Sequence, residues 1–245
     1  MAGLLISDSL MKNCPVEAQA QLIRSYGLDN LDVKVFPGKT TRELIGGDGE
    51  VHSLLRAKQY DHVFLVSGAN CFNRNSDDCP FRKCRMVADQ IKDLIHSFCQ
   101  QYPYVELVFA PIPYRQICQI PSVVERFPES GSQAWIGTTN QAIFHFQNYF
   151  SICSCHSHRA RFIASPDLSV WSKLLSKDGL HLTDFGKLQM IKFIISSKSR
   201  FTFDGVEFPP LPKPSGSFSF EPQVSIPRRI PIKKVVENHN LFTHQ

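Results

Sequence analysis

The sequence predicts an α/β fold in which a parallel sheet is covered by helices on both faces. Short, continuously apolar runs alternate with longer segments of helical periodicity over residues 1–200. Hairpin signals between the apolar runs are scarce. Parallel strands buried on both faces are continuously apolar, and their alternation with helices favours crossover connections rather than hairpins.

Five apolar runs are predicted to form the strands. The clearest is 62–67, which is apolar almost throughout and rich in residues that favour strands. Turn-forming residues close the first two runs, Asp8 and Ser9 after one and Pro37 and Gly38 after the other. In chain order the predicted strands are 3–7, 33–36, 62–67, 105–110 and 161–163.

Helical spacing fills the segments between these runs. Pro15 is acceptable in a first turn, and Thr40 with Glu43 forms a capping box that opens a helix. The glycine-rich run Gly46-Gly47-Asp48-Gly49 interrupts this segment, and a polar loop is expected over 71–79. The predicted helices are 15–26, 40–45, 51–57, 81–102, 135–150 and 184–195.

Composition indicates an ordinary globular domain followed by a different kind of segment. Of 245 residues, 42% are hydrophobic and 20% charged, and the net charge of +5 permits an anionic partner without requiring one. We expect a domain over 1–200 and a proline-rich, basic, disordered tail over 201–245. This tail is a solvated linker or makes a weak contact with nucleic acid.

The N-terminus and the cysteines bear on the cellular compartment. Asp8 closes the first apolar run too early for a signal peptide, and no stretch approaches the ~18 apolar residues of a membrane span. We therefore expect a cytoplasmic or nuclear protein with reduced thiols. Cys153, Cys155, His156 and His158 are either a zinc site of unusually tight spacing or surface residues at a helix end.

Residues suited to nucleophilic catalysis follow the predicted strands. They are the hydroxyl of Ser9, the glycine Gly38, the side-chain amide of Asn70, and the pair Asp178 and His181. Because ligands bind beyond the carboxyl ends of parallel strands, all of them are expected at one rim. A simpler interpretation also exists: Ser9 caps a helix, and 178–183 form an Asp-Gly turn with Thr183 as a helix cap.

These residues resemble the sequence blocks of the SGNH, or GDSL-like, hydrolase family. Residues 6–10 resemble the first block, Gly38 the second, 68–70 the third and 178–181 the last, so the resemblance spans most of the domain. It is strongest to small intracellular esterase-type members, some of which occur in retroelement-derived proteins. It implies a flavodoxin-like three-layer α/β/α sandwich around a five-stranded parallel sheet.

The resemblance also implies a function and a role for each residue. The chain would hydrolyse an ester of a small or acyl-bearing substrate without metal or cofactor. Ser9 would be the nucleophile, His181 the general base and Asp178 its orienting acid. The backbone amides of Ser9 and Gly38 and the side chain of Asn70 would hold the oxyanion. A serine at a helix start would also gain from the helix dipole.

Two departures from the family pattern occur, and other catalytic motifs are incomplete. Ser7 stands in place of a glycine and is expected to crowd the turn, and Cys71 replaces an aspartate outside the triad. Ser9 and Lys12 match a β-lactamase motif whose partner motifs are absent from the sequence. The alternative left open is a non-catalytic SGNH-like module that binds RNA, which the mild basicity favours.

Overall fold

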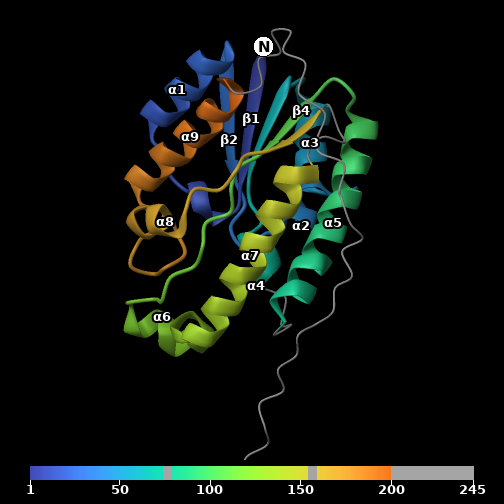
Figure 1. The fold of residues 1–245 in the computed structure, drawn as a ribbon. Helices are drawn as coiled ribbons and strands as arrows, with labels where there is room; N and C mark the ends of the chain where they lie inside the picture. The colour runs from blue at the N-terminus through green and yellow to red at the C-terminus, as the bar shows by residue number, and fades with distance from the viewer. Residues whose placement is uncertain (74–78, 154–158, 200–245) are drawn as a thin grey trace, which may run out of the picture. The chain divides into compact units, whose positions relative to one another are not determined.

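The computed structural model describes residues 1–73, 79–153 and 159–199 (Figure 1). Five parallel strands form one sheet in the order β2-β1-β3-β4-β5, which confirms the predicted sheet. The strands are β1 (Ala2–Ser7), β2 (Asn30–Val35), β3 (His62–Val66), β4 (Glu106–Phe109) and β5 (Ala160–Phe162). The second strand begins at Asn30, three residues before the predicted start. The prediction missed these residues because β2 is an edge strand whose half-exposed residues are not continuously apolar.

Helices cover both faces of this sheet, so the predicted three-layer α/β/α arrangement is confirmed (Figure 1). On one face α1 (Val16–Tyr26) packs against α9 (Asp184–Ser199), and on the other α5 (Pro80–Gln101) packs against α7 (Gln133–Cys153). The shorter helices are α2 (Thr41–Ile45), α3 (Glu50–Ala57), α4 (Ala69–Asn73), α6 (Pro121–Arg126) and α8 (Leu168–Leu174), with 3-10 turns η1 (Ser9–Met11) and η2 (Pro128–Gly131).

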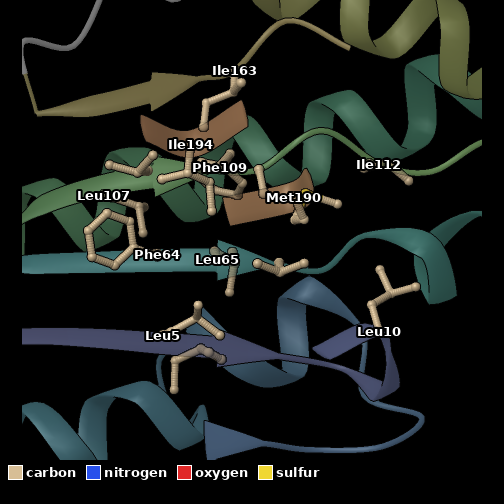
Figure 2. Packing of buried hydrophobic residues seen from close by; sticks show 14 of the residues in the cluster. Leu5, Leu10, Phe64, Leu65, Leu107, Phe109, Ile112, Ile163, Met190 and Ile194 are labelled. Carbon is tan, nitrogen blue, oxygen red and sulfur yellow. The ribbon is translucent and has the colours of Figure 1, made fainter. Parts of the chain in front are cut away.

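The core lies between the central strands and the helices on either side. Leu5 of β1, Leu65 of β3 and Leu107 of β4 are fully buried (Figure 2). Met190 and Ile194 of α9 are also fully buried, one turn apart on the helix. This spacing places both side chains on one face of α9, as expected for a helix that covers a sheet.

Strand register sets the position of the functional rim. Ser7, the last residue of β1, pairs with Val35 of β2 and with Val66 of β3. The three strands therefore end at the same level. The residues that follow them, from Asp8, Phe36 and Ser67 onward, begin at one edge of the sheet.

One of three local predictions is confirmed and two are wrong. Thr40 and Glu43 form the predicted capping box, with the Thr40 hydroxyl accepting from the Glu43 amide. The helix expected to start at Ser9 is only the three-residue 3-10 turn η1, too short for a sizeable dipole. Part of the loop expected over 71–79 belongs to α4, whose five residues are too few to display a periodic pattern.

The remaining predictions concern membrane spans, the C-terminal tail and the cysteine–histidine cluster. No helix among the described residues is both long and apolar enough to cross a membrane. The tail over 201–245 lies outside the described residues, so its predicted disorder and nucleic-acid contact stay predictions. The proposed zinc cluster at 153–158 lies outside them too, apart from the backbone of Cys153 at the end of α7.

Candidate active site

Ser9 is presented by a tight turn directly after β1. The Oδ1 atom of Asp8 accepts a hydrogen bond from the backbone N–H of Leu10 at 2.9 Å, which caps η1. Ser7, expected to crowd this turn, strengthens it instead. Its buried hydroxyl donates to the Val66 carbonyl at 2.9 Å and accepts from the Met11 amide at 3.2 Å. The nucleophile candidate therefore stands on a turn fastened to β3.

His181 is carried by a loop that folds back on itself. Leu175 and Leu182 form an antiparallel bridge, and the Ser176 amide donates to the His181 carbonyl at 2.8 Å. Thr183 then caps α9, its hydroxyl accepting from the Gly186 amide at 3.0 Å. The simpler interpretation of 178–183 as a turn with a helix cap is thus also true, and the same capped turn presents the imidazole.

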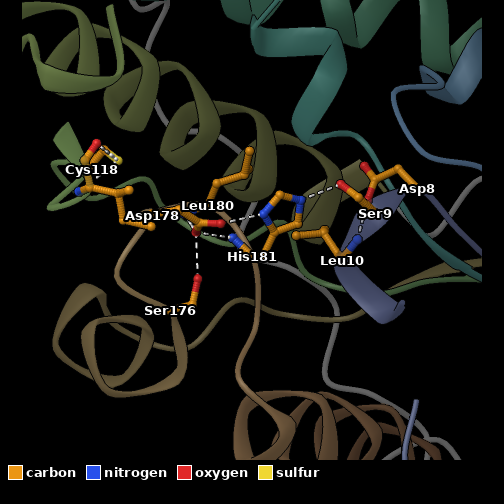
Figure 3. A network of polar contacts seen from close by, with 9 residues as sticks. Asp8, Ser9, Leu10, Cys118, Ser176, Asp178, Leu180 and His181 are labelled. Carbon is orange, nitrogen blue, oxygen red and sulfur yellow. Dashed lines mark hydrogen bonds and ion pairs between the residues drawn. The ribbon is translucent and has the colours of Figure 1, made fainter. Parts of the chain in front are cut away.

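The side chains of Ser9, His181 and Asp178 form a continuous hydrogen-bonded chain (Figure 3). The imidazole Nε2 lies 2.8 Å from Ser9 Oγ, and Nδ1 lies 2.6 Å from Asp178 Oδ2. A carboxylate accepts hydrogen bonds, so the contact with Asp178 assigns the ring proton to Nδ1. Nε2 is then left with its lone pair facing the serine hydroxyl, and this arrangement can take a proton from Ser9.

Asp178 is held as a carboxylate by its hydrogen bonds. Burial opposes its ionisation, but four hydrogen bonds outweigh burial and keep the pKa of Asp178 well below its usual range. They come from the imidazole of His181, the hydroxyl of Ser176 and the backbone amides of His181 and Leu180. The side chain of His181 is 39% exposed, so a substrate can reach the ring while its acid partner is more deeply buried.

A second segment supports this loop from the side. The Gln116 amide donates to the Gly179 carbonyl at 3.0 Å, and the Gln119 amide donates to the Lys177 carbonyl at 2.8 Å. Gly179 has φ +70°, and a Cβ atom there would lie 2.1 Å from the Gln116 carbonyl oxygen. Only glycine satisfies both the left-handed backbone and this close approach.

The predicted oxyanion donors Gly38 and Asn70 lie in two segments that are fastened to each other. Gly38 has φ +77°, and the Asn70 side-chain amide donates to the Lys39 carbonyl at 3.0 Å. Cys71 also contributes, because its thiol sulfur accepts from the Thr41 amide at 3.4 Å. The joint approach of these donors and the Ser9 amide to one oxyanion stays a prediction.

Two buried charged residues beside the site were not identified from the sequence. Burial raises the pKa of Asp8 from 3.8 to about 6, against the opposing effects of the Leu10 amide, Arg115 and His181. Burial also lowers the pKa of Arg115 to about 10, while Asp8 and Asp178 act in the opposite direction. Asp8 lies in the first sequence block, but Arg115 lies in an irregular segment without any motif.

A cavity of about 460 Å³ lies beside α7 and the segment that leads into α8. Two aromatic side chains, Tyr114 and Phe144, contribute to its walls. None of the five predicted site residues lines it. This volume lies within the usual range for small-molecule sites, but the hydrogen-bonded chain of Ser9, His181 and Asp178 lies outside its lining.

No family model and no curated protein matches the chain, whereas solved structures do. One is Est24, a carbohydrate acetylesterase from Sinorhizobium meliloti, at 14% identity over 81% of this chain and 98% of that chain, with a TM-score of 0.53. The M. smegmatis aryl esterase gives the same four values. A lipolytic protein of the G-D-S-L family from Veillonella parvula is 13% identical over 82% of this chain and 99% of that chain, with a TM-score of 0.52.

At such low identity the likeness concerns the fold. The chain has the fold of the GDSL-type, or SGNH, hydrolases, as the resemblance of its sequence blocks predicted. A retroelement origin of this chain, which its resemblance to retroelement-derived members suggests, stays a prediction.

Proposed function

We propose that the chain is a serine esterase that cleaves a carboxylic ester through Ser9, His181 and Asp178. The observation that supports this most strongly is the unbroken hydrogen-bonded chain, 2.8 Å from Ser9 to His181 and 2.6 Å from His181 to Asp178. A serine hydroxyl is a weak nucleophile until a neighbouring base takes its proton, and this geometry supplies the base and its orienting acid.

The reaction would proceed in two halves. Ser9 Oγ attacks the ester carbonyl carbon while Nε2 of His181 takes the hydroxyl proton, giving a tetrahedral oxyanion. The amides of Ser9 and Gly38 and the side chain of Asn70 donate to that oxyanion. The intermediate collapses, the alcohol leaves with the proton from His181, and the acyl group stays on Ser9. Water then attacks the acyl carbon while His181 takes its proton, giving a second tetrahedral oxyanion. The bond between the acyl carbon and Ser9 Oγ breaks, His181 returns the proton to Ser9, and the carboxylic acid leaves.

Asp178 would stabilise the imidazolium that forms in each half-reaction. Its carboxylate accepts the Nδ1–H bond and stays ionised, because its hydrogen bonds hold its pKa low. An ionised partner keeps Nε2 available as the proton acceptor and orients the ring toward Ser9. The proposed mechanism needs no group beyond the side chains and amides named, and a small or acyl-bearing ester is the proposed substrate.

The proposal is tested by active-site labelling together with turnover. We expect the wild type to react with a fluorophosphonate probe at Ser9 and to hydrolyse an aryl acetate, a substrate suggested by the aryl esterase and acetylesterase of the same fold. Ser9→Ala should lose both activities. Ser172→Ala is the matched control, because that exposed hydroxyl donates to the Ser169 carbonyl in its own helix, and it should retain both.

The alternative of an RNA-binding module makes a different prediction. Salt-dependent RNA binding that survives Ser9→Ala, with neither labelling nor hydrolysis of any short ester by the wild type, would replace the esterase proposal. Because a labelled Ser9 requires an activated hydroxyl, labelling alone separates the two functions.

A further inference from the structure

Arg115 lies in the irregular segment 110–120 between β4 and α6, and side chains of α7 hold the backbone of this segment. Asn140 accepts from the Arg115 amide at 2.6 Å and donates to the Arg115 carbonyl at 2.9 Å. Two turns further along α7, Gln147 makes the same pair of contacts with Ile112, at 3.2 and 3.3 Å. These two amide clamps fix the point from which the Arg115 side chain extends.

The guanidinium of Arg115 spans the short helix α4. Its Nη2 atom donates to the Ala69 carbonyl at 3.0 Å and to Asn73 Oδ1 at 2.9 Å, which are the first and last residues of α4. Asn70, the predicted oxyanion donor, lies between these two contacts. A helix of five residues gains little from its own hydrogen bonds, so its position depends on such outside partners.

Arg115 is also placed among the charges of the candidate site. Its side chain is buried, and the carboxylates that attract it are Asp8, next to Ser9, and Asp178, next to His181. The Oδ2 atom of Asp8 and the Nε atom of Arg115 are both buried and have no hydrogen-bond partner among the described residues. A buried guanidinium is tolerated where opposite charge and hydrogen bonds compensate it, and here these come from the elements that carry the site.

From these contacts we infer that Arg115 is a positioning residue that fixes α4, and with it the Asn70 amide, relative to the Ser9 turn. The inference rests on the proposed esterase function for its kinetic consequence. Among the described residues the hydrogen bonds of the Arg115 side chain go to α4 and not to the predicted nucleophile or base, so it acts through Asn70. An oxyanion donor stabilises the transition state more than the bound substrate, so its displacement lowers kcat and leaves KM nearly unchanged.

The test compares Arg115→Met and Arg115→Lys with the wild type in the full-length chain. We expect Arg115→Met to lower kcat for an aryl acetate by about 10- to 100-fold, because a displacement of about 1 Å has effects of this size. KM should change by less than about threefold. Arg115→Lys, which keeps the charge on a shorter side chain, should retain part of kcat and of the thermal stability.

Hydrogen exchange provides a readout that does not depend on esterase activity. Amides in a peptide covering residues 67–73 should exchange about tenfold faster in Arg115→Met, because two charge-assisted hydrogen bonds to α4 are lost. Arg161→Met is the matched control. That arginine pairs with Glu106 at the start of β4, at the other end of the strands, so its loss should reduce stability without changing kcat or exchange in α4.

The outcomes are distinguishable. Unchanged exchange in α4 together with unchanged kcat would overturn the inference, as would an equal loss of kcat in Arg115→Met and Arg161→Met. A rise in KM without a fall in kcat would also overturn it. If the wild type neither hydrolyses esters nor labels at Ser9, the esterase proposal fails by itself, and faster exchange confined to α4 would still support the positioning of Asn70 by Arg115.

Discussion

At the scale of single residues, the carboxylate of Asp178 divides its two oxygens between structure and chemistry. Oδ1 accepts from the Ser176 hydroxyl at 2.6 Å and from the amides of Leu180 and His181 at 2.9 Å each. Among the residues with a described position, Oδ2 accepts only from the His181 imidazole, at 2.6 Å. One oxygen therefore builds the loop while the other orients the ring, and substitutions can separate these two contributions.

Asp178→Asn should leave the loop in place but move the imidazole proton from Nδ1 to Nε2. The amide oxygen can keep the Oδ1 contacts, while an N–H group in the Oδ2 position favours the wrong ring tautomer. We expect kcat to fall by roughly 10⁴-fold, as in serine proteases with the corresponding change. Ser176→Ala is the matched variant. It removes one loop contact and should cost about 1 kcal/mol of stability with little change in kcat. Equal kinetic losses in the two variants would contradict this division.

Asp8 should make stability depend on pH. Its folded pKa of about 6 lies above its ordinary 3.8, so the folded chain binds this proton more tightly than the unfolded chain. The stabilisation is complete below pH 3.8 and is lost as pH rises through about 6. Relative to wild type, Asp8→Asn should therefore gain about 2 kcal/mol in the free energy of unfolding between about pH 4 and pH 7. Chemical denaturation of both proteins across this pH range measures the effect. A difference in the free energy of unfolding that stays constant from about pH 4 to about pH 7 would exclude it.

At the scale of elements, the loop of Asp178 and His181 depends on the segment that lies beside it. Gly179 brings the loop backbone against Gln116, and the backbone hydrogen bonds of Gln116 and Gln119 hold it there. The loop also begins and ends at the Leu175–Leu182 bridge. The position of the imidazole is thus a property of two packed segments.

Gly179→Ala should disturb this contact. The left-handed backbone costs an alanine about 1–2 kcal/mol, and its Cβ would meet the Gln116 carbonyl. We expect lower thermal stability and a fall in kcat as His181 moves. Gly137→Ala in α7 is the control: apart from the backbone of its own helix, no heavy atom of the described residues lies within 4 Å of its added Cβ, and it should gain about 0.5–1 kcal/mol. Denaturation and turnover of both variants would check this, and full activity in Gly179→Ala would refute it.

Elements differ in how far the sequence predicts them. Long helices and central strands were predictable because their periodicity reflects burial, and the residues after β1, β2 and β3 were assigned to one rim from parallel topology. Arg115 was not predictable, because its partners Ala69 and Asn140 are 46 and 25 residues away in the chain. The segment that carries it has no period, since its backbone hydrogen bonds go to side chains of α7 and to the loop of Asp178 and His181.

At the scale of the domain over the described residues, stability and the candidate chemistry are located in different places. The core lies between the sheet and its helices, whereas the hydrogen-bonded chain of Ser9, His181 and Asp178 lies beyond the strand ends (Figures 2 and 3). Leu65 is fully buried in β3, the strand between β1 and β4. A cavity there would weaken the whole fold without touching the candidate site.

Leu65→Ala should therefore destabilise the domain by about 2–5 kcal/mol, the usual cost of such a truncation in a core. At temperatures where the variant remains folded, labelling of Ser9 by a fluorophosphonate should proceed at the wild-type rate. Chemical denaturation and labelling kinetics measure these two quantities separately. A labelling rate that falls while the variant is still folded would show that the core and the rim are coupled.

The amide clamps of α7 have a consequence for how the sequence can diverge. Within the described part of the chain, the side-chain hydrogen bonds of Asn140 and Gln147 go to main-chain atoms of Arg115 and Ile112, so they hold the course of the segment whichever side chains its other residues carry. Tyr114, between the clamped residues, contributes to the wall of the 460 Å³ cavity. Substitutions at position 114, by mutational drift or in a designed library, can therefore vary the lining of that cavity on an unchanged backbone.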